Sequence, residues 1–149
     1  MTVDIRAASR TVMIVDDAFF MRNLLRSILE MAGYRVVAEA EDGEKAVAAY
    51  REHRPDLVIM DVIMPVMNGV DAARQILDFD RDACVVMCSI IGLEQMVDAA
   101  REAGAAGVIF KPFTADEVIT TLWQALGERP APAGRDREKE AVPACPRPQ

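Results

Sequence analysis

The sequence has little of what several functional classes require. Its 17 Lys and Arg residues are outnumbered by 24 Asp and Glu, which gives a net charge of −7 and leaves no basic stripe of the kind that a nucleic-acid-binding surface needs. No apolar run approaches the ~20 residues of a membrane span, and residues 1–10 lack the apolar core of a signal peptide. We therefore expect a cytoplasmic protein with no nucleic-acid and no membrane partner.

Cysteine and histidine are also scarce, with three and one among 149 residues. Cys84 and Cys88 belong to one strand-like run, where four residues of extended chain separate them by ~13 Å, beyond the ~7 Å limit for a disulfide. Cys145 stands apart near the end of the sequence, and His53 lies in a polar connection. A metal site built from Cys and His is thereby excluded, and we expect Cys84 and Cys88 to be buried as small apolar side chains.

Short apolar runs alternate regularly with amphipathic segments along most of the sequence. The pattern predicts strands over residues 11–15, 35–40, 57–60, 84–88 and 108–110. It predicts helices over residues 18–32, 44–52, 70–79 and 93–103, and a last helix that begins at Thr114. Five strand–helix units with short connections indicate an α/β fold with a mostly parallel sheet covered on both faces.

Two of these helices carry specific local signals. The helix over residues 18–32 places four apolar side chains on one face, which we expect to be buried, and a glycine suited to a helix C-terminus follows it. These residues are Phe20, Leu24, Ile28, Met31 and the terminating Gly33. In the last helix, Thr114 and Glu117 have the spacing of a capping box, which predicts two reciprocal hydrogen bonds at the N-terminus.

The composition divides the chain into three parts. Residues 1–10 form a short polar leader, and residues 11–126 form one folded domain, as a chain of this length supports. Residues 127–149 hold five of the eight prolines and nearly balanced charges, so we expect a disordered, proline-rich tail. The tail is too short and too rich in proline to be an output domain.

Three of the predicted strands end in charged residues. Asp16 and Asp17 come directly after the first strand, Asp61 after the third, and Lys111 after the fifth. Continuous apolar runs of this length are typical of buried parallel strands. The carboxyl ends of such strands face one crevice, where ligands bind, so the sequence predicts one site with three carboxylates and one ammonium.

Neighbouring carboxylates repel one another unless a cation lies between them. Mg²⁺ binds one or two carboxylates together with waters and phosphate oxygens, which fits this set. Asp16 or Asp17 could instead cap the helix that follows, but capping requires one acid and does not account for Asp61. Lys111 supplies a compact charge for a phosphoryl oxygen, and Ser89, at the end of the fourth strand, adds a hydroxyl at the same edge.

Together these segments resemble the signature of response-regulator receiver domains. The resemblance extends from about residue 10 to residue 126 and preserves the order and spacing of the motifs, which are VDD at residues 15–17, MDVIMPVMNG at 60–69, CS at 88–89 and FKPF at 110–113. The segment DDAFFMR at residues 16–22 resembles in particular the single-domain, CheY-like chemotaxis type. The resemblance implies a flavodoxin-like, doubly wound (βα)5 fold with a five-stranded parallel sheet in the order 2-1-3-4-5. It also implies a cis peptide bond between Lys111 and Pro112.

The resemblance assigns a role to each charged residue of the predicted site. Asp61 would be the phosphoacceptor, which attacks a phosphohistidine on a sensor histidine kinase. Asp17 would bind Mg²⁺ directly, Asp16 would bind it largely through water, and the backbone carbonyl of Ile63 would complete the protein ligands. The two side chains that would bind the phosphoryl oxygens are those of Ser89 and Lys111.

The function implied by the resemblance is that of a stand-alone response regulator that signals by protein–protein contact, with chemotaxis as the candidate process. The flagellar motor switch is the downstream target it suggests, and another regulator fits as well. Such a protein is not an enzyme beyond any self-dephosphorylation. Two alternatives stay open: a binding module that is not switched by phosphorylation, and a Mg²⁺-dependent phosphohydrolase. The second commonly has another acid two residues after its nucleophile, where this chain has Ile63.

Four positions near the site differ from the usual family pattern. Val108 stands where many receivers have an aromatic residue that swings inward on phosphorylation, and a valine cannot report the state in that way. Ile90 follows the hydroxyl residue, where a small residue is usual. Ile63 and Ile91 stand where polar residues are common and offer no hydrogen bond to an attacking water, so we expect slow self-dephosphorylation. Together with Val66, these isoleucines could alternatively form an exposed docking patch.

Overall fold

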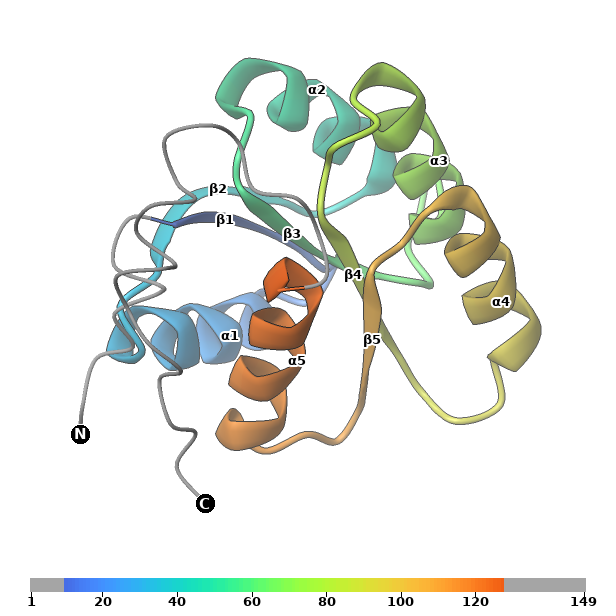
Figure 1. The fold of residues 1–149 in the computed structure, drawn as a ribbon. Helices are drawn as coiled ribbons and strands as arrows, with labels where there is room; N and C mark the ends of the chain where they lie inside the picture. The colour runs from blue at the N-terminus through green and yellow to red at the C-terminus, as the bar shows by residue number, and fades with distance from the viewer. Residues whose placement is uncertain (1–9, 128–149) are drawn as a thin grey trace.

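The computed structural model describes residues 10–127, so nearly all of the expected leader and tail lies outside the described residues. Five strands form one sheet in the order β2-β1-β3-β4-β5, and every neighbouring pair is parallel (Figure 1). The predicted fold class and strand order are therefore confirmed. The strands are β1 (Thr11–Val15), β2 (Arg35–Ala40), β3 (Leu57–Asp61), β4 (Val85–Ser89) and β5 (Gly107–Phe110). The helices are α1 (Phe19–Met31), α2 (Gly43–His53), α3 (Gly69–Phe79), α4 (Glu94–Ala103) and α5 (Ala115–Gly127).

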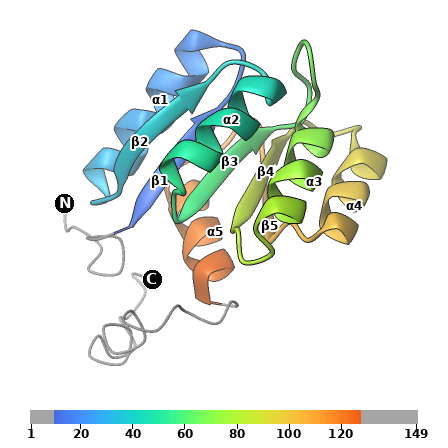
Figure 2. The same cartoon turned by 90° about the horizontal axis from the view of Figure 1, so that it is seen from above.

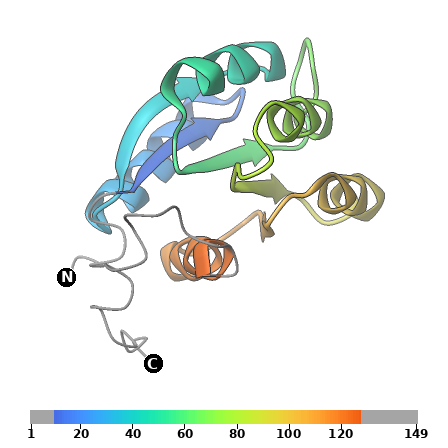
Figure 3. The ribbon, with the colours of Figure 1, turned by 45° about the horizontal axis from the view of Figure 1, so that its top comes forward.

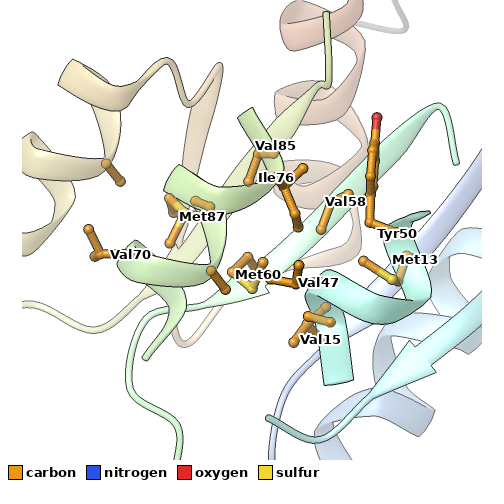
Figure 4. Close-up of a cluster of buried hydrophobic side chains, with 14 of the residues drawn as sticks. Met13, Val15, Val47, Tyr50, Val58, Met60, Val70, Ile76, Val85 and Met87 are labelled. Carbon is orange, nitrogen blue, oxygen red and sulfur yellow. The ribbon is translucent and has the colours of Figure 1, made fainter. Parts of the chain in front are cut away.

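The sheet lies between two layers of helices. Helices α1 and α5 cover one face, and α2, α3 and α4 cover the other (Figures 2 and 3). Because successive strand residues point to opposite faces, Val12 and Ile14 pack with α1 and α5, whereas Met13 and Val15 pack with the other helices. Figure 4 shows the second of these clusters, which also contains Met60 of β3.

The helix boundaries follow from local hydrogen bonds that the sequence encodes. The backbone N–H of Thr114 donates to Glu117 at 2.9 Å, and the N–H of Glu117 donates to the Thr114 hydroxyl at 3.1 Å, which confirms the predicted capping box. Asp42 caps α2 and Asn68 caps α3 through their side-chain oxygens. After α1 the chain turns at Gly33, whose φ of 101° lies in the left-handed region that glycine tolerates.

The predicted apolar face of α1 is wrong except for Ile28, which packs against the core. Phe20, Leu24 and Met31 are 72%, 39% and 61% exposed, whereas Leu25 and Leu29 are fully buried against the sheet. The helix carries two apolar stripes about one residue apart, and only one of them can face the core. The stripe that contacts the sheet consists of Met21, Leu25, Ile28, Leu29 and Ala32.

Cys84 and Cys88 are buried as predicted, although β4 begins at Val85, so Cys84 lies directly before the strand. Cys84 and Cys88 are both buried in the cluster beneath α1 and α5, and no disulfide joins them. His53 is exposed, as expected, but forms the last residue of α2 and does not belong to the connection. Among residues 10–127, no helix has the length and apolar character that crossing a membrane requires.

Candidate functional site

The carboxyl ends of two neighbouring strands bring the predicted acids to one place. Asp16 and Asp17 directly follow β1, and Asp61 is the last residue of β3, which pairs with β1. One carboxylate oxygen from each residue lies within 4.8 Å of the others. Asp16 and Asp61 are buried whereas Asp17 is exposed, so Asp17 is the acid through which the cluster meets solvent.

Lys111 enters this cluster from the end of β5. Its Nζ donates to Oδ2 of Asp16 at 3.0 Å and to Oδ1 of Asp61 at 3.3 Å, and its backbone N–H donates to the carbonyl of Ser89 at 2.7 Å. Burial acts to lower the pKa of Lys111, but the hydrogen bond and charge of Asp16 and the charge of Asp61 outweigh burial and raise it. The lysine therefore stays charged and partly neutralises the two buried acids.

Asp16 is fixed through its backbone and through both carboxylate oxygens. Its N–H donates to the carbonyl of Ala40 at 3.1 Å, Oδ1 accepts from the N–H of Ala18 at 2.9 Å, and Oδ2 accepts from Lys111. Ala18 occupies the N-cap position of α1 and makes no side-chain capping bond. The capping interpretation is thus correct in part, because Asp16 organises the turn before the helix while Asp17 does not.

The environment of Asp61 disfavours a negative charge. Burial raises the pKa of this carboxyl to about 6, the charge of Asp16 adds to the rise, and Lys111 opposes it. An ionised carboxylate that is destabilised by burial and by a neighbouring negative charge attracts a cation strongly. A nearby positive charge offsets the repulsion between Asp16 and Asp61 and part of the desolvation penalty. The site is therefore poised to bind a metal ion or another positive group.

The loop after β3 is held close against Asp61. The N–H of Gly69 donates to the carbonyl of Val62 at 2.8 Å, and a Cβ at Gly69 would lie 2.8 Å from the carbonyl carbon of Asp61, nearer than Cβ atoms approach. In the same loop, Val66 has a φ of 69°, in the left-handed region that a β-branched residue rarely adopts. The loop therefore has a tight backbone that depends on glycine at position 69.

The remaining predicted residues lie at the same edge of the sheet. Ser89, the last residue of β4, is buried, and its hydroxyl donates to the carbonyl of Ile90 at 2.9 Å. Ile63 lies on the loop two residues beyond Asp61. The side chains of Ile63, Ile90 and Ile91 are all exposed. Slow self-dephosphorylation and a docking patch, the two interpretations of these isoleucines, both stay predictions.

Two further expectations concern β5. The Lys111–Pro112 peptide bond is cis, as the resemblance implies. Val108 is partly buried and packs against the cluster beneath α2, α3 and α4. Since valine has neither a ring nor a second side-chain torsion, the inward swing of an aromatic residue is not available at this position.

One contact of the site, made by Arg22, has no motif in the sequence. Arg22, in the first turn of α1, donates from Nη1 to the carbonyl of Asp16 at 2.6 Å and from Nε to Oε1 of Glu39 at 3.0 Å. Two sequence signals accompany it: a cation near a helix N-terminus, where the helix dipole disfavours it, and an acid inside the apolar run of β2. Neither signal by itself identifies the contact.

Comparison with known proteins gives a consistent result for the region that forms the fold. A family model described as response regulator receiver domain matches residues 12–122. The chain is similar to the chemotaxis protein CheY of Bacillus subtilis, with 48% identity over 115 residues that cover 77% of this chain and 96% of the relative. It is similar to CheY of Thermotoga maritima, with 46% identity over 113 residues that cover 76% of this chain and 94% of the relative.

A solved structure shares the same fold. The crystal structure of the CheX–CheY–BeF3–Mg²⁺ complex from Borrelia burgdorferi matches with a TM-score of 0.76 and 34% identity, and the match covers 78% of this chain and 89% of that chain. The described fold, the acidic cluster and these similarities agree on one family.

Proposed function

The chain belongs to the response-regulator receiver family, whose members are signalling phosphoacceptors, and we propose that Asp61 accepts the phosphoryl group here. The observation that carries the proposal is the pairing of Lys111 with two buried acids, Asp16 and Asp61. Both carboxylate oxygens of Asp16 are occupied, whereas only Oδ1 of Asp61 accepts a hydrogen bond among residues 10–127. The second oxygen of Asp61 is available for attack.

The proposed reaction moves a phosphoryl group from nitrogen to oxygen. A carboxylate oxygen of Asp61 attacks the phosphorus of a phosphohistidine on a sensor histidine kinase, the P–N bond breaks, and the imidazole nitrogen keeps the bonding electrons. Lys111 then pairs with one phosphoryl oxygen, and the Ser89 hydroxyl donates to another after it leaves the carbonyl of Ile90. Such a transfer depends on positioning and charge neutralisation more than on acid–base groups.

Mg²⁺ fits the donor set of the site. It prefers carboxylate oxygens and retains several waters, and three carboxylates converge here with one of them exposed. We assign direct binding to Asp17, binding largely through water to Asp16, and a backbone carbonyl ligand to Ile63. When bound, the ion supplies charge neutralisation for the transferring phosphoryl group.

Intact-mass spectrometry tests the proposal. The protein is incubated with Mg²⁺ and a small acyl phosphate, and we expect the mass to increase by one phosphoryl group. Asp61→Ala should remove the adduct, whereas Asp98→Ala, at an exposed acid on α4, should keep it. Absence of an adduct in the wild type would favour a binding module that is not switched by phosphorylation, and continuous release of phosphate from many esters would favour a phosphohydrolase.

The relatives supply the candidate process. The similar proteins from two bacteria are named chemotaxis proteins, and the matched CheY from Borrelia burgdorferi was crystallised with CheX. We therefore propose chemotaxis, with a histidine kinase upstream and a protein such as the flagellar motor switch or another regulator downstream. This role belongs in the cytoplasm, where ATP supplies the kinase.

The lifetime of the phosphorylated state should be long. Ile63 lies beside Asp61 with its side chain half exposed and offers no hydrogen bond to orient an attacking water. We expect Ile63→Asn to shorten the half-life of the phosphorylated protein several-fold, as followed by loss of the mass adduct in Mg²⁺ after the phosphodonor is removed. Val66→Asn, the same kind of change at an exposed position three residues further along the same loop, should leave the half-life within about twofold. A variant Ile63→Asn that decays as slowly as the wild type would contradict this expectation.

A further inference from the structure

Arg22 contacts the acidic loop, the connection between β1 and α1 that carries Asp16 and Asp17. Its guanidinium donates to the backbone carbonyl of Asp16 at 2.6 Å and to Glu39 at 3.0 Å, and the side chain is only 13% exposed. The ring of Phe19 lies over the guanidinium, 5.6 Å from ring centroid to Cζ. A long, charged side chain is thus held in one place next to the acidic loop.

Glu39 of β2 keeps the guanidinium in this orientation. Its second oxygen, Oε2, accepts from Nε of Arg26 at 2.8 Å, so Glu39 is itself held from two sides and presents Oε1 to Arg22. A guanidinium directs its donors rigidly within one plane. With Nε fixed on Glu39, Nη1 of Arg22 can reach the carbonyl of Asp16 and hold it.

The carbonyl of Asp16 belongs to the peptide unit that joins Asp16 to Asp17. The N–H of Asp16, in the preceding peptide unit, is anchored on Ala40, and its carboxylate accepts from Ala18. The bond from Arg22 therefore adds a third fixed point on Asp16, directly before Asp17. Asp17 is exposed, and no hydrogen bond or ion pair holds its side chain within the described range. The peptide that Arg22 holds therefore fixes the position of Cα of Asp17, and only the two side-chain torsions of Asp17 remain free to adjust its carboxylate.

We propose that Arg22 is a positioning residue that sets the Asp17 carboxylate for a divalent cation, an inference that rests on the proposed Mg²⁺-dependent function. The contribution is one of geometry rather than charge. A lone guanidinium near the site would repel a cation, but Glu39 compensates its charge at 3.0 Å. Loss of Arg22 leaves the acids in place and frees the peptide that orients one of them.

Arg26 provides a matched control. It pairs with the same Glu39 through two nitrogens and also with Glu30, but it makes no hydrogen bond to Asp16. Arg26→Met therefore removes a comparable ion pair from the same helix without freeing the acidic loop. A difference between the two variants isolates the bond to the Asp16 carbonyl.

The readout is the stabilisation of the folded protein by Mg²⁺, which needs neither kinase nor phosphodonor. Urea unfolding of the full chain is measured in chelator and over a series of Mg²⁺ concentrations, and the increase in unfolding free energy gives Kd. We expect Arg22→Met to raise the Kd for Mg²⁺ about five- to tenfold and Arg26→Met to leave it within twofold, since only Arg22 fixes the ligand geometry.

The proposal is overturned if Mg²⁺ increases the unfolding free energy of Arg22→Met and Arg26→Met equally, even when Arg22→Met is less stable in chelator. Arg22 would then have only a structural role. If Mg²⁺ does not increase the unfolding free energy of the wild type, the assigned Mg²⁺ site is wrong and this inference fails with it. That result differs from equal stabilisation of the two variants, which overturns the role of Arg22 alone. If Arg22→Met does not fold, Arg22→Lys and Arg26→Lys give the same comparison with the same two outcomes, because lysine keeps the charge without the planar pair of donors.

Discussion

Replacing Asp61 with asparagine is expected to stabilise the metal-free protein by about 2 kcal/mol at neutral to mildly alkaline pH. Burial and the charge of Asp16 raise the pKa of Asp61 to about 6, well above the range of an unfolded chain. The ionised carboxylate therefore costs folding free energy, and a neutral amide of nearly the same shape removes that cost. The effect is opposite to that of most substitutions at buried positions.

The sign of the pH dependence follows from the raised pKa. Between about pH 4 and pH 6 the folded state binds a proton at Asp61 more tightly than the unfolded state does, so this group stabilises the fold in acid. That contribution is lost as the pH rises through the folded pKa of about 6. The advantage of Asp61→Asn should therefore be small near pH 4, grow through pH 6 and level off above it.

Urea denaturation in chelator at several pH values measures this difference. Asp98→Asn, at an exposed position on α4, serves as the control and should change little. Added Mg²⁺ should reduce the advantage of Asp61→Asn, because the ion stabilises the folded wild type more strongly than the variant. If Asp61→Asn is less stable than the wild type above pH 7 in chelator, Lys111 compensates the buried charge fully, and the cost inferred from burial is wrong.

The charged ends of the strands could be predicted from the sequence because each follows directly from its own apolar run. A buried parallel strand reads as one apolar run, so the residue that follows it must lie at the carboxyl edge of the sheet. This is how Asp61 and Lys111, fifty residues apart, were expected to lie together. The capping box of α5 was predictable for the same reason, since Thr114 and Glu117 satisfy each other within a single turn.

Features that depend on how elements are placed relative to one another could not be predicted. Helix α1 has two adjacent apolar stripes, and packing against the sheet determines which of them is buried. The sequence pattern therefore predicts a face that includes Phe20, whereas the structure buries Leu25. The contact of Arg22 with Glu39 requires α1 to lie beside β2, and no pattern in either segment states that. The tight loop next to Asp61 likewise becomes evident only when Gly69 is seen against its carbonyl.

That close approach makes Gly69→Ala the most damaging small substitution that we expect. An added methyl group would overlap the carbonyl of Asp61 and come within 3.1 Å of Cγ of Met60. The obstacle is the backbone of a central strand, which cannot move away as a flexible side chain can. Overpacking of this kind should cost about 3 kcal/mol, which would lower the midpoint of thermal unfolding by roughly 6–12 °C.

Gly107→Ala is the matched control for Gly69→Ala, because the nearest atom to a Cβ at Gly107 is the methyl carbon of Thr121 at 3.4 Å. This change should be nearly neutral in thermal unfolding. Gly69→Ala should also slow phosphorylation by an acyl phosphate under conditions where the variant is still folded, because relief of the overlap must move either α3 or Asp61 itself. If folded Gly69→Ala accepts the phosphoryl group at the wild-type rate, α3 alone has shifted, and the position of Asp61 does not depend on its contact with Gly69.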